Sequence, residues 1–241
     1  MTSRADPRLT DVARSLLRRR SDAGPLIVGV TGGVASGKTT FSAALQSRLA
    51  RARRGFKIER VCTDGFLHSN AVLASRGLSM RKGFPESYDS AALAAALAAA
   101  RVGEVDFPGY SHETYDVDPA LTRRIAPPGV LIVEGLGLPA GGAARPPLID
   151  VLIYLDAEEA FIEAWFVARF MGLWTAGKTD PASFYARFRD LGAAEADRFA
   201  RSVWKAINLP VLRESVLPLR ALADLVVVKG EGHDILAVTE R

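Results

Sequence analysis

The chain has 241 residues, of which 49% are hydrophobic and 24% charged, and its formal net charge is +4. This composition suits one sizeable α/β core and excludes an intrinsically disordered protein. The single cysteine, Cys62, excludes an internal disulfide framework, and no apolar run reaches the roughly 18 residues that a membrane span needs. Since the first residues also lack an apolar signal region, we expect a cytoplasmic protein without a membrane partner.

Positive charge is concentrated in the first 60 residues, which hold thirteen Lys and Arg against four Asp and Glu. A nucleic-acid surface would explain this asymmetry. However, the arginines at 18–20 and 51–54 fall at the C-terminal ends of predicted helices, where cations interact favourably with the helix dipole. We therefore expect no nucleic-acid partner.

The chain begins with an amphipathic pattern over residues 8–20, which predicts a helix. We assign residues 1–24 as an N-terminal helical segment and residues 25–241 as the main domain. The main domain opens with an apolar run at 26–30, which predicts a buried strand.

A glycine-rich motif follows this strand. Residues 32–39 read Gly-Gly-Val-Ala-Ser-Gly-Lys-Thr and fit the P-loop pattern G-x-x-x-x-G-K-[ST]. Its glycines let backbone N–H groups point at phosphate oxygens, and the helix predicted at 38–50 adds its positive N-terminus. The motif therefore predicts binding of ATP or GTP, with Lys38 on the outer phosphates and Thr39 on Mg²⁺. The predicted nucleotide-binding residues are Gly32, Gly33, Val34, Ala35, Ser36, Gly37, Lys38, Thr39 and Thr40.

The remaining predicted elements alternate between strands and helices. We expect strands at 57–62, 130–133, 150–155 and 224–228, a helix at 91–101, a loop over 71–88 and a short extended stretch at 104–117. Continuous apolar strands separated by helices favour a parallel sheet with helices on both faces. The predicted fold class is thus α/β, of the P-loop NTPase type, with ligands at the C-terminal ends of the strands.

Two carboxylates end predicted strands. Asp64 follows the second strand, where a kinase needs a carboxylate to orient and deprotonate the attacking hydroxyl; a tight Asp64-Gly65 turn is the alternative. Glu134 follows the strand at 130–133, as an acidic residue does in a Walker B strand, and we expect it to hold Mg²⁺ through water.

A helical stretch around residues 161–173 is apolar on two sides. One side comprises Phe166, Arg169, Phe170 and Leu173, and the other comprises Phe161, Trp165, Ala168 and Gly172. We expect the side with Arg169 to line a pocket and the other side to pack on the core. On the pocket side, Arg169 needs an anionic partner, either a nucleotide phosphate or an internal carboxylate.

Several longer motifs combine uncommon residues at fixed positions. With them, the chain resembles the bacterial type I pantothenate kinases, which belong with uridine kinase and phosphoribulokinase among the P-loop kinases. The motifs lie at 63–68, 81–89, 110–117, 133–136, 165–170, 179–181 and 204–208. The likeness runs from about residue 26 to His233. It implies transfer of the γ-phosphate of ATP, with Mg²⁺, to a primary hydroxyl of pantothenate, and it suggests a homodimer.

The resemblance also implies residue roles. Lys38 and Thr39 match the family's phosphate and Mg²⁺ residues, Asp64 its catalytic base and Arg169 its transition-state cation. His233 stands where the family places a histidine against the adenine. Without the resemblance, the residues at 112 and 208 could equally be an ordinary loop histidine and a helix-terminal amide. The implied substrate residues are Asp64, Tyr110, His112, Tyr115, Phe166 and Asn208.

The chain departs from the family at four positions. Phe166 replaces a tyrosine that contacts the substrate, and Leu173 and Lys178 replace phenylalanines. Ala43 replaces an arginine that helps to hold coenzyme A as feedback inhibitor, so we expect weak feedback. These changes keep two alternatives open: a kinase of the same architecture for another small polyol, sugar or nucleoside, and a nucleotide-sensing module without turnover.

Overall fold

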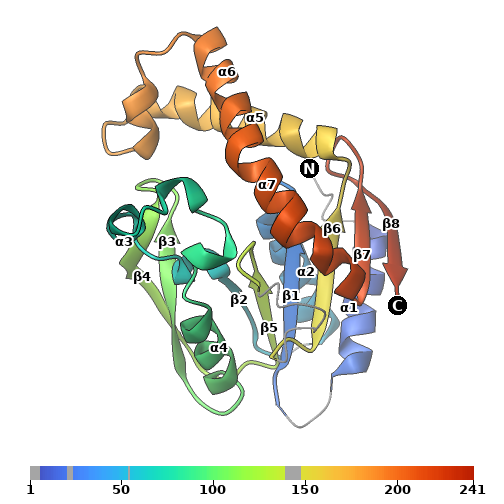
Figure 1. The fold of residues 1–241 in the computed structure, drawn as a ribbon. Coiled ribbons are helices and arrows are strands. Elements are labelled where there is room, and N and C mark those ends of the chain that lie inside the picture. Colours follow the sequence, from blue (N-terminus) through green and yellow to red (C-terminus); the bar gives the residue numbers. More distant parts are fainter. Residues whose placement is uncertain (1–5, 21–23, 54, 139–147) are drawn as a thin grey trace.

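The computed structural model describes residues 6–20, 24–53, 55–138 and 148–241. A six-stranded sheet in the order β2-β5-β1-β6-β7-β8 forms its centre (Figure 1). Its strands are β1 (Leu26–Gly32), β2 (Ile58–Cys62), β5 (Val130–Glu134), β6 (Val151–Asp156), β7 (Leu225–Lys229) and β8 (Ile235–Glu240). A separate two-stranded sheet pairs β3 (Val105–Ser111) with β4 (Asp116–Ile125).

The helices cover both faces of the large sheet, so the predicted α/β fold class is confirmed. The α-helices of the described residues are α1 (Pro7–Arg19), α2 (Lys38–Ala52), α3 (Asn70–Ser75), α4 (Ser90–Ala99), α5 (Glu159–Gly177), α6 (Ala193–Val203) and α7 (Leu209–Val211). None of the helices in these described ranges is long and apolar enough to cross a membrane.

Two hydrophobic clusters lie on opposite faces of the sheet because successive side chains of a strand alternate. On β1, Val28 and Val30 join the cluster that contains α1 and α2, whereas Ile27 joins the one that contains α4 and the segment after α6. Leu9 and Leu16 of α1 are fully buried in the first cluster. The N-terminal helix thus shares the core of the main sheet, and the division at residue 24 stays a prediction.

Strand β8 differs from the prediction of a wholly parallel sheet. The pairs from β2 to β7 are parallel, but β8 runs antiparallel to β7 at the edge. Its residues are mostly exposed, with only Ile235 fully buried, so this strand lacks the continuous apolar run that marks the central ones.

Two other local predictions were incomplete. The stretch 71–88 is more than a loop, because Ser69 caps the short helix α3 through its Oγ, which accepts from the N–H of Val72. The stretch at 104–117 is the start of a hairpin whose second strand, β4, extends to Ile125. Most of β4 is exposed and rich in charge, which hides it from an apolar pattern.

Charged side chains lie at helix ends, as predicted for the arginines of the first two helices. The Asp89 carboxylate accepts from the N–H of Ala92 and caps α4. Arg18 and Arg19 lie in the last turn of α1, and Arg51 in the last turn of α2; Arg54 lies outside the described residues.

The helical run from α6 through α7 forms a long rod that crosses the sheet (Figure 1). Two π-helical turns interrupt it, at Trp204–Asn208 and at Leu212–Val216. Pro210 lacks an N–H and cannot close the ordinary helical hydrogen bond to the preceding turn, which explains the wide turn before it. The first π turn brings Asn208 into a cavity above the sheet.

Candidate active site

The P-loop joins β1 to α2 at the C-terminal edge of the sheet. Gly37, at the N-terminus of α2, has a φ of 85°. This conformation favours glycine, and a Cβ there would also lie 2.8 Å from Nζ of Lys229. Lys38 Nζ donates to the carbonyls of Gly32 (3.1 Å) and Gly33 (2.9 Å). Burial lowers the pKa of Lys38, against the opposing charges of Glu134 and Asp64.

Thr39 and Glu134 meet beside the P-loop. Thr39 Oγ1 donates to Glu134 Oε1 at 2.8 Å, and Arg60 lies 3.7 Å from the same oxygen. Glu134 is 3% exposed, and burial raises its pKa. A hydroxyl and a carboxylate held together are oxygen donors of the kind that Mg²⁺ prefers, with phosphates and water completing its shell. These residues therefore fit a magnesium ion.

A cavity of about 460 Å³ opens over the P-loop. This volume lies within the range of small-molecule sites. Its lining residues are Val34, Ala35, Gly37, Lys38, Thr39, Thr40, Cys62, Asp64, His112, Glu134, Gly135, Leu136, Trp165, Arg169 and His233. The other predicted P-loop residues, Gly32, Gly33 and Ser36, are buried and do not line this cavity. We refer to this space as the nucleotide cavity.

Trp165 and His233 form a stacked pair in the nucleotide cavity. Their ring centroids are 3.8 Å apart and the planes differ by 23°. Trp165 Nε1 donates to the carbonyl of Glu231 at 2.7 Å, which ties α5 to the turn after β7. Burial and the neighbouring Lys229 lower the pKa of His233 to about 4, so its imidazole is neutral at pH 7.

Asp64 lies in a 3₁₀ turn, Thr63–Phe66, directly after β2. Its N–H donates to Cys62 Sγ at 3.5 Å, and its Oδ1 accepts from the hydroxyl of the buried Tyr88, also at 3.5 Å. Burial raises the pKa of Cys62, which keeps the thiol protonated. The carboxylate of Asp64 lines the cavity, so a mere turn-capping role does not describe it.

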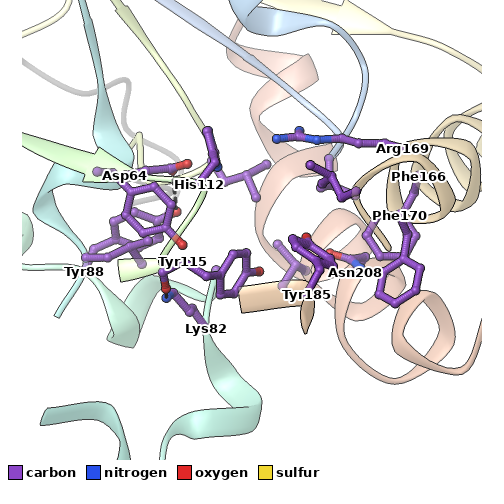
Figure 2. Close-up of a pocket in the computed structure, with 17 residues that line it drawn as sticks. Asp64, Lys82, Tyr88, His112, Tyr115, Phe166, Arg169, Phe170, Tyr185 and Asn208 are labelled. Atoms are coloured by element: carbon purple, nitrogen blue, oxygen red, sulfur yellow. Dashed lines mark hydrogen bonds between the residues drawn. The ribbon is translucent and has the colours of Figure 1, made fainter. Parts of the chain in front are cut away.

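A second, smaller cavity of about 120 Å³ lies beside the first, and we call it the acceptor cavity. Figure 2 shows that its walls come from distant segments, with residues 64–115 on one side and α5, the turn after it and the π turn on the other. Besides Asp64, the predicted substrate residues Tyr110, His112, Tyr115, Phe166 and Asn208 all line it.

Lys82 brings a half-buried cation to the acceptor cavity. Its Nζ donates to Asn70 Oδ1 (2.7 Å) and to the carbonyl of Tyr115 (2.6 Å), and lies over the rings of Tyr110 and Tyr115. Burial lowers its pKa to about 8. Tyr115 has a φ of +57°, which turns its carbonyl toward Lys82 and Asn70 Nδ2.

Helix α5 supplies the apolar wall of the acceptor cavity. The predicted pocket face is right, because Phe166, Arg169, Phe170 and Leu173 all line the cavity. The predicted core face is wrong: Ala168 and Gly172 are exposed and Trp165 faces the nucleotide cavity. The residues of α5 that are buried are instead Ile162, Val167, Phe170, Trp174 and Gly177. Phe170 both lines the acceptor cavity and is buried in the packing of α5, which a helical pattern with two separate faces does not anticipate.

Arg169 extends from α5 toward the side of the cavity that carries His112 (Figure 2). Within the described parts of the chain, no hydrogen bond or ion pair to its guanidinium is found, so the alternative of an internal carboxylate partner is not supported there. Partial burial and the guanidinium of Arg169 lower the pKa of His112, which favours its neutral form.

The two cavities share polar residues. Asp64, His112 and Arg169 line both of them, together with the apolar Val34 and Leu136. A carboxylate, an imidazole and a guanidinium thus lie where the contents of one cavity would meet the contents of the other. This arrangement suits transfer of a negatively charged group between two bound molecules.

Comparison with known proteins agrees with a site for the transfer of a negatively charged group. The profile of the "Phosphoribulokinase / Uridine kinase family" matches residues 27–171. Proteins named pantothenate kinase from Parvibaculum lavamentivorans and Afipia carboxidovorans are each 42% identical to the chain. The first match covers 95% of this chain and 74% of its relative, and the second 97% and 77%.

The chain belongs to the phosphoribulokinase and uridine kinase family, among the pantothenate kinases. It is therefore an ATP-dependent kinase of a small molecule. A provisionally named fructose transport system kinase from Silicibacter sp. TM1040 has a similar fold, with a TM-score of 0.69 and 24% identity. That match covers 90% of this chain and 98% of the other.

Some residues of this kinase's site were not predicted from sequence. Lys82 and Tyr88 lie in motifs of the resemblance, but a lysine and a tyrosine in a polar stretch do not reveal that they line a cavity, with Lys82 half-buried and Tyr88 buried. Lys229 did carry a signal, because it directly ends an apolar strand. Lys178, in contrast, is exposed over the ring of Trp174 and does not line the acceptor cavity.

Proposed function

We propose that this kinase transfers the γ-phosphate of ATP to the primary hydroxyl of pantothenate. The observation that carries the proposal is the junction of the two cavities, where Asp64, His112 and Arg169 face both. A nucleotide-sensing module would need the phosphate cradle alone. The acceptor cavity beside it therefore favours a phosphotransferase over a sensor.

The proposed chemistry assigns tasks to Asp64, to Arg169 and to the P-loop. The carboxylate of Asp64 accepts the proton of the hydroxyl while the hydroxyl oxygen attacks the γ-phosphorus. The bond from the γ-phosphorus to the bridging oxygen breaks, and ADP leaves. Lys38 and the backbone of the P-loop hold the phosphates, and Arg169 neutralises the charge on the transferred group.

Thr39 and Glu134 are the residues that would hold Mg²⁺, because their oxygens already lie 2.8 Å apart beside the P-loop. When bound, this ion would neutralise charge on the phosphates. The contribution of the chain itself is to fix the two oxygens. The positive charges of Lys38 and Arg60 stabilise the negative charge of the buried Glu134 carboxylate.

The acceptor cavity suits a small carboxylic acid with an aliphatic body. On one wall Lys82 offers a cation and Tyr110 and Tyr115 offer hydrogen-bond donors; the opposite wall carries the amide of Asn208 and is otherwise largely apolar, through the side chains of Phe166, Phe170, Leu173 and Val211 (Figure 2). Pantothenate combines a carboxylate, an amide and a branched apolar segment, and so matches both walls. A free sugar would leave the apolar wall against hydroxyl groups that it cannot pair.

The test is a comparison of acceptors with purified protein, ATP and Mg²⁺. Pantothenate, D-glycerate, fructose and uridine are supplied separately, and the phosphorylated product is identified by mass spectrometry and phosphorus NMR. We expect kcat/KM for pantothenate to exceed the others by at least about 10²-fold, since discrimination based on buried polar groups is of that order or larger. A higher kcat/KM for another acceptor, or no product from pantothenate, would contradict the proposal.

Two further expectations remain proposals. The resemblance suggests a homodimer, and the sequence suggests a cytoplasmic location; light scattering of the purified protein and fractionation of cells are the respective tests.

A further inference from the structure

Lys229 is a buried lysine that the chemistry above does not use. It ends β7 at the C-terminal edge of the sheet, and only 2% of it is exposed. Burying an ammonium group is unfavourable unless it is well hydrogen-bonded. Burial, with the nearby charge of Lys38, lowers its pKa to about 8, whereas Asp234 opposes this shift.

The Nζ atom of Lys229 contacts both halves of the nucleotide cavity. On the phosphate side it donates to the carbonyl of Ser36 at 2.7 Å, and Ser36 is itself fully buried in the P-loop. On the other side it lies 3.3 Å from Nδ1 of His233, whose ring stacks on Trp165. It also lies 5.7 Å from the centroid of the Trp165 ring.

The P-loop is shaped around this ammonium group. A Cβ at Gly37 would lie 2.8 Å from Nζ, so the glycine that begins α2 leaves room for the lysine as well as for a left-handed backbone. None of the ion pairs found among the described residues includes Lys229. Its hydrogen bonds therefore go to nucleotide-binding elements rather than to a carboxylate.

The contact with His233 restricts the imidazole to one form. An ammonium has three donors and no acceptor, so Nδ1 must accept and cannot carry a proton. The neutral ring then carries its proton on Nε2, and its orientation is set by Lys229 on one side and by the Trp165 ring against its face.

We propose that Lys229 is a positioning residue for the nucleotide: it ties the P-loop, through Ser36, to the His233–Trp165 stack and thereby fixes the phosphate cradle relative to the opposite end of the cavity. This inference rests on nucleotide binding at this site and is independent of which acceptor is phosphorylated. Since Trp165 belongs to α5, the same contact connects the P-loop to the helix that carries Arg169.

The test compares Lys229→Met, which removes all donors at nearly the same length, with Lys229→Gln, which keeps an uncharged donor. Lys205→Met, at an exposed lysine of the π turn, is the matched control. We expect Lys229→Met to raise KM for ATP roughly tenfold or more, the size expected for loss of a charge-assisted hydrogen bond. Lys229→Gln should lie between, and KM for the acceptor should change less than about twofold.

The coupling to His233 is measured separately. In the His233→Ala background, Lys229→Met should have a smaller effect on KM for ATP, because half of its partners are already missing. If Lys229→Met lowers the melting temperature but leaves KM for ATP unchanged, Lys229 is only structural and the proposal is wrong. Equal effects of Lys229→Met in both backgrounds would remove the link through His233.

A measurement on the unmodified protein keeps the proposal testable if both variants fail to fold. The chain has three histidines, so nitrogen NMR of the rings can be assigned with His68→Gln and His112→Gln variants. The proposal requires His233 at pH 7 to be neutral with its proton on Nε2. A proton on Nδ1 would overturn it.

Discussion

The nucleotide cavity and the acceptor cavity are built in different ways. The first has one contiguous stretch, residues 34–40, as its floor, and Glu134 of β5, Trp165 of α5 and His233 of the turn after β7 add to it. The second has no contiguous motif, because its walls come from residues 64–88, from the β3–β4 hairpin, from α5 and from the π turn.

Their polar groups also differ in how they are held. In the nucleotide cavity, Lys38 donates to two carbonyls and Thr39 donates to Glu134. On the acceptor side, Lys82 is anchored, but the guanidinium of Arg169 has no hydrogen bond within the described residues. The phosphate cradle is thus largely formed before ligands bind, whereas at the junction the bound ligands would supply the anionic partner of Arg169.

Of the variants that test this difference between the cavities, Arg169→Met should have the largest effect on kcat. Arg169→Met removes the cation at the junction, and we expect kcat to fall roughly 10³-fold or more because such a cation acts mainly on the transition state. Affinity for ATP should change far less, as measured by titration. Arg198→Met, on the exposed face of α6, is the control and should keep normal turnover. A loss of ATP affinity as large as the loss of kcat would show that Arg169 belongs to the cradle instead.

Lys82 should affect the acceptor alone. We expect Lys82→Met to raise KM for pantothenate roughly 10- to 100-fold, which is the loss of a charge-assisted hydrogen bond, with KM for ATP nearly unchanged. Thermal unfolding must accompany the kinetics, because Lys82 also ties Asn70 to Tyr115. An unchanged KM for pantothenate in a folded Lys82→Met protein would exclude a carboxylate contact at this position.

The pH dependence of kcat/KM for pantothenate gives a second test of Lys82. Lys82 is charged below its pKa of about 8 and neutral above it, so the attraction for an anionic acceptor is lost as the pH rises through that value. In the free enzyme, kcat/KM for pantothenate should then fall about tenfold per pH unit above about 8. The Lys82→Met profile should lack this step. A step retained in the variant would have to come from another group.

Phe166 should have the smallest effect. Its ring lines the acceptor cavity and lies 6.1 Å from that of Trp204. If pantothenate is the acceptor, Phe166→Tyr should lower its KM a few-fold to about tenfold, since one new hydrogen bond contributes about 0.5–1.5 kcal/mol. A rise in KM of similar size would indicate that the hydroxyl is buried without a partner, and would favour an acceptor with an apolar surface there.

The same difference between the cavities explains what could be predicted from sequence. The P-loop was found because its residues are consecutive and each has a backbone or charge function at a fixed spacing. Glu134 and Asp64 were found because they end recognisable strands. Tyr110, His112 and Asn208 were placed only through a family resemblance, since nothing in their local pattern shows which distant helix they face.

Other features of the site could be recognised only from the three-dimensional structure. The partial burial of Lys82 depends on a hairpin whose exposed second strand has no apolar pattern, and the role of Trp165 depends on contact with a turn 66 residues away. Phe170 serves both the core and the cavity, which periodicity alone cannot express. Lys229 is the exception, because a lysine that ends an apolar strand is already unusual in the sequence.

The most direct test of the account is Asp64→Asn, because Asp64 faces both cavities and is the proposed base. The amide keeps the shape of the side chain but cannot accept the proton, so kcat should fall roughly 10²- to 10⁴-fold. Asp190→Asn, at an exposed carboxylate, is the control. Calorimetric titration of Asp64→Asn should find ATP and pantothenate bound with nearly normal affinity. Near-normal turnover by Asp64→Asn would contradict the claim that phosphoryl transfer takes place at this junction.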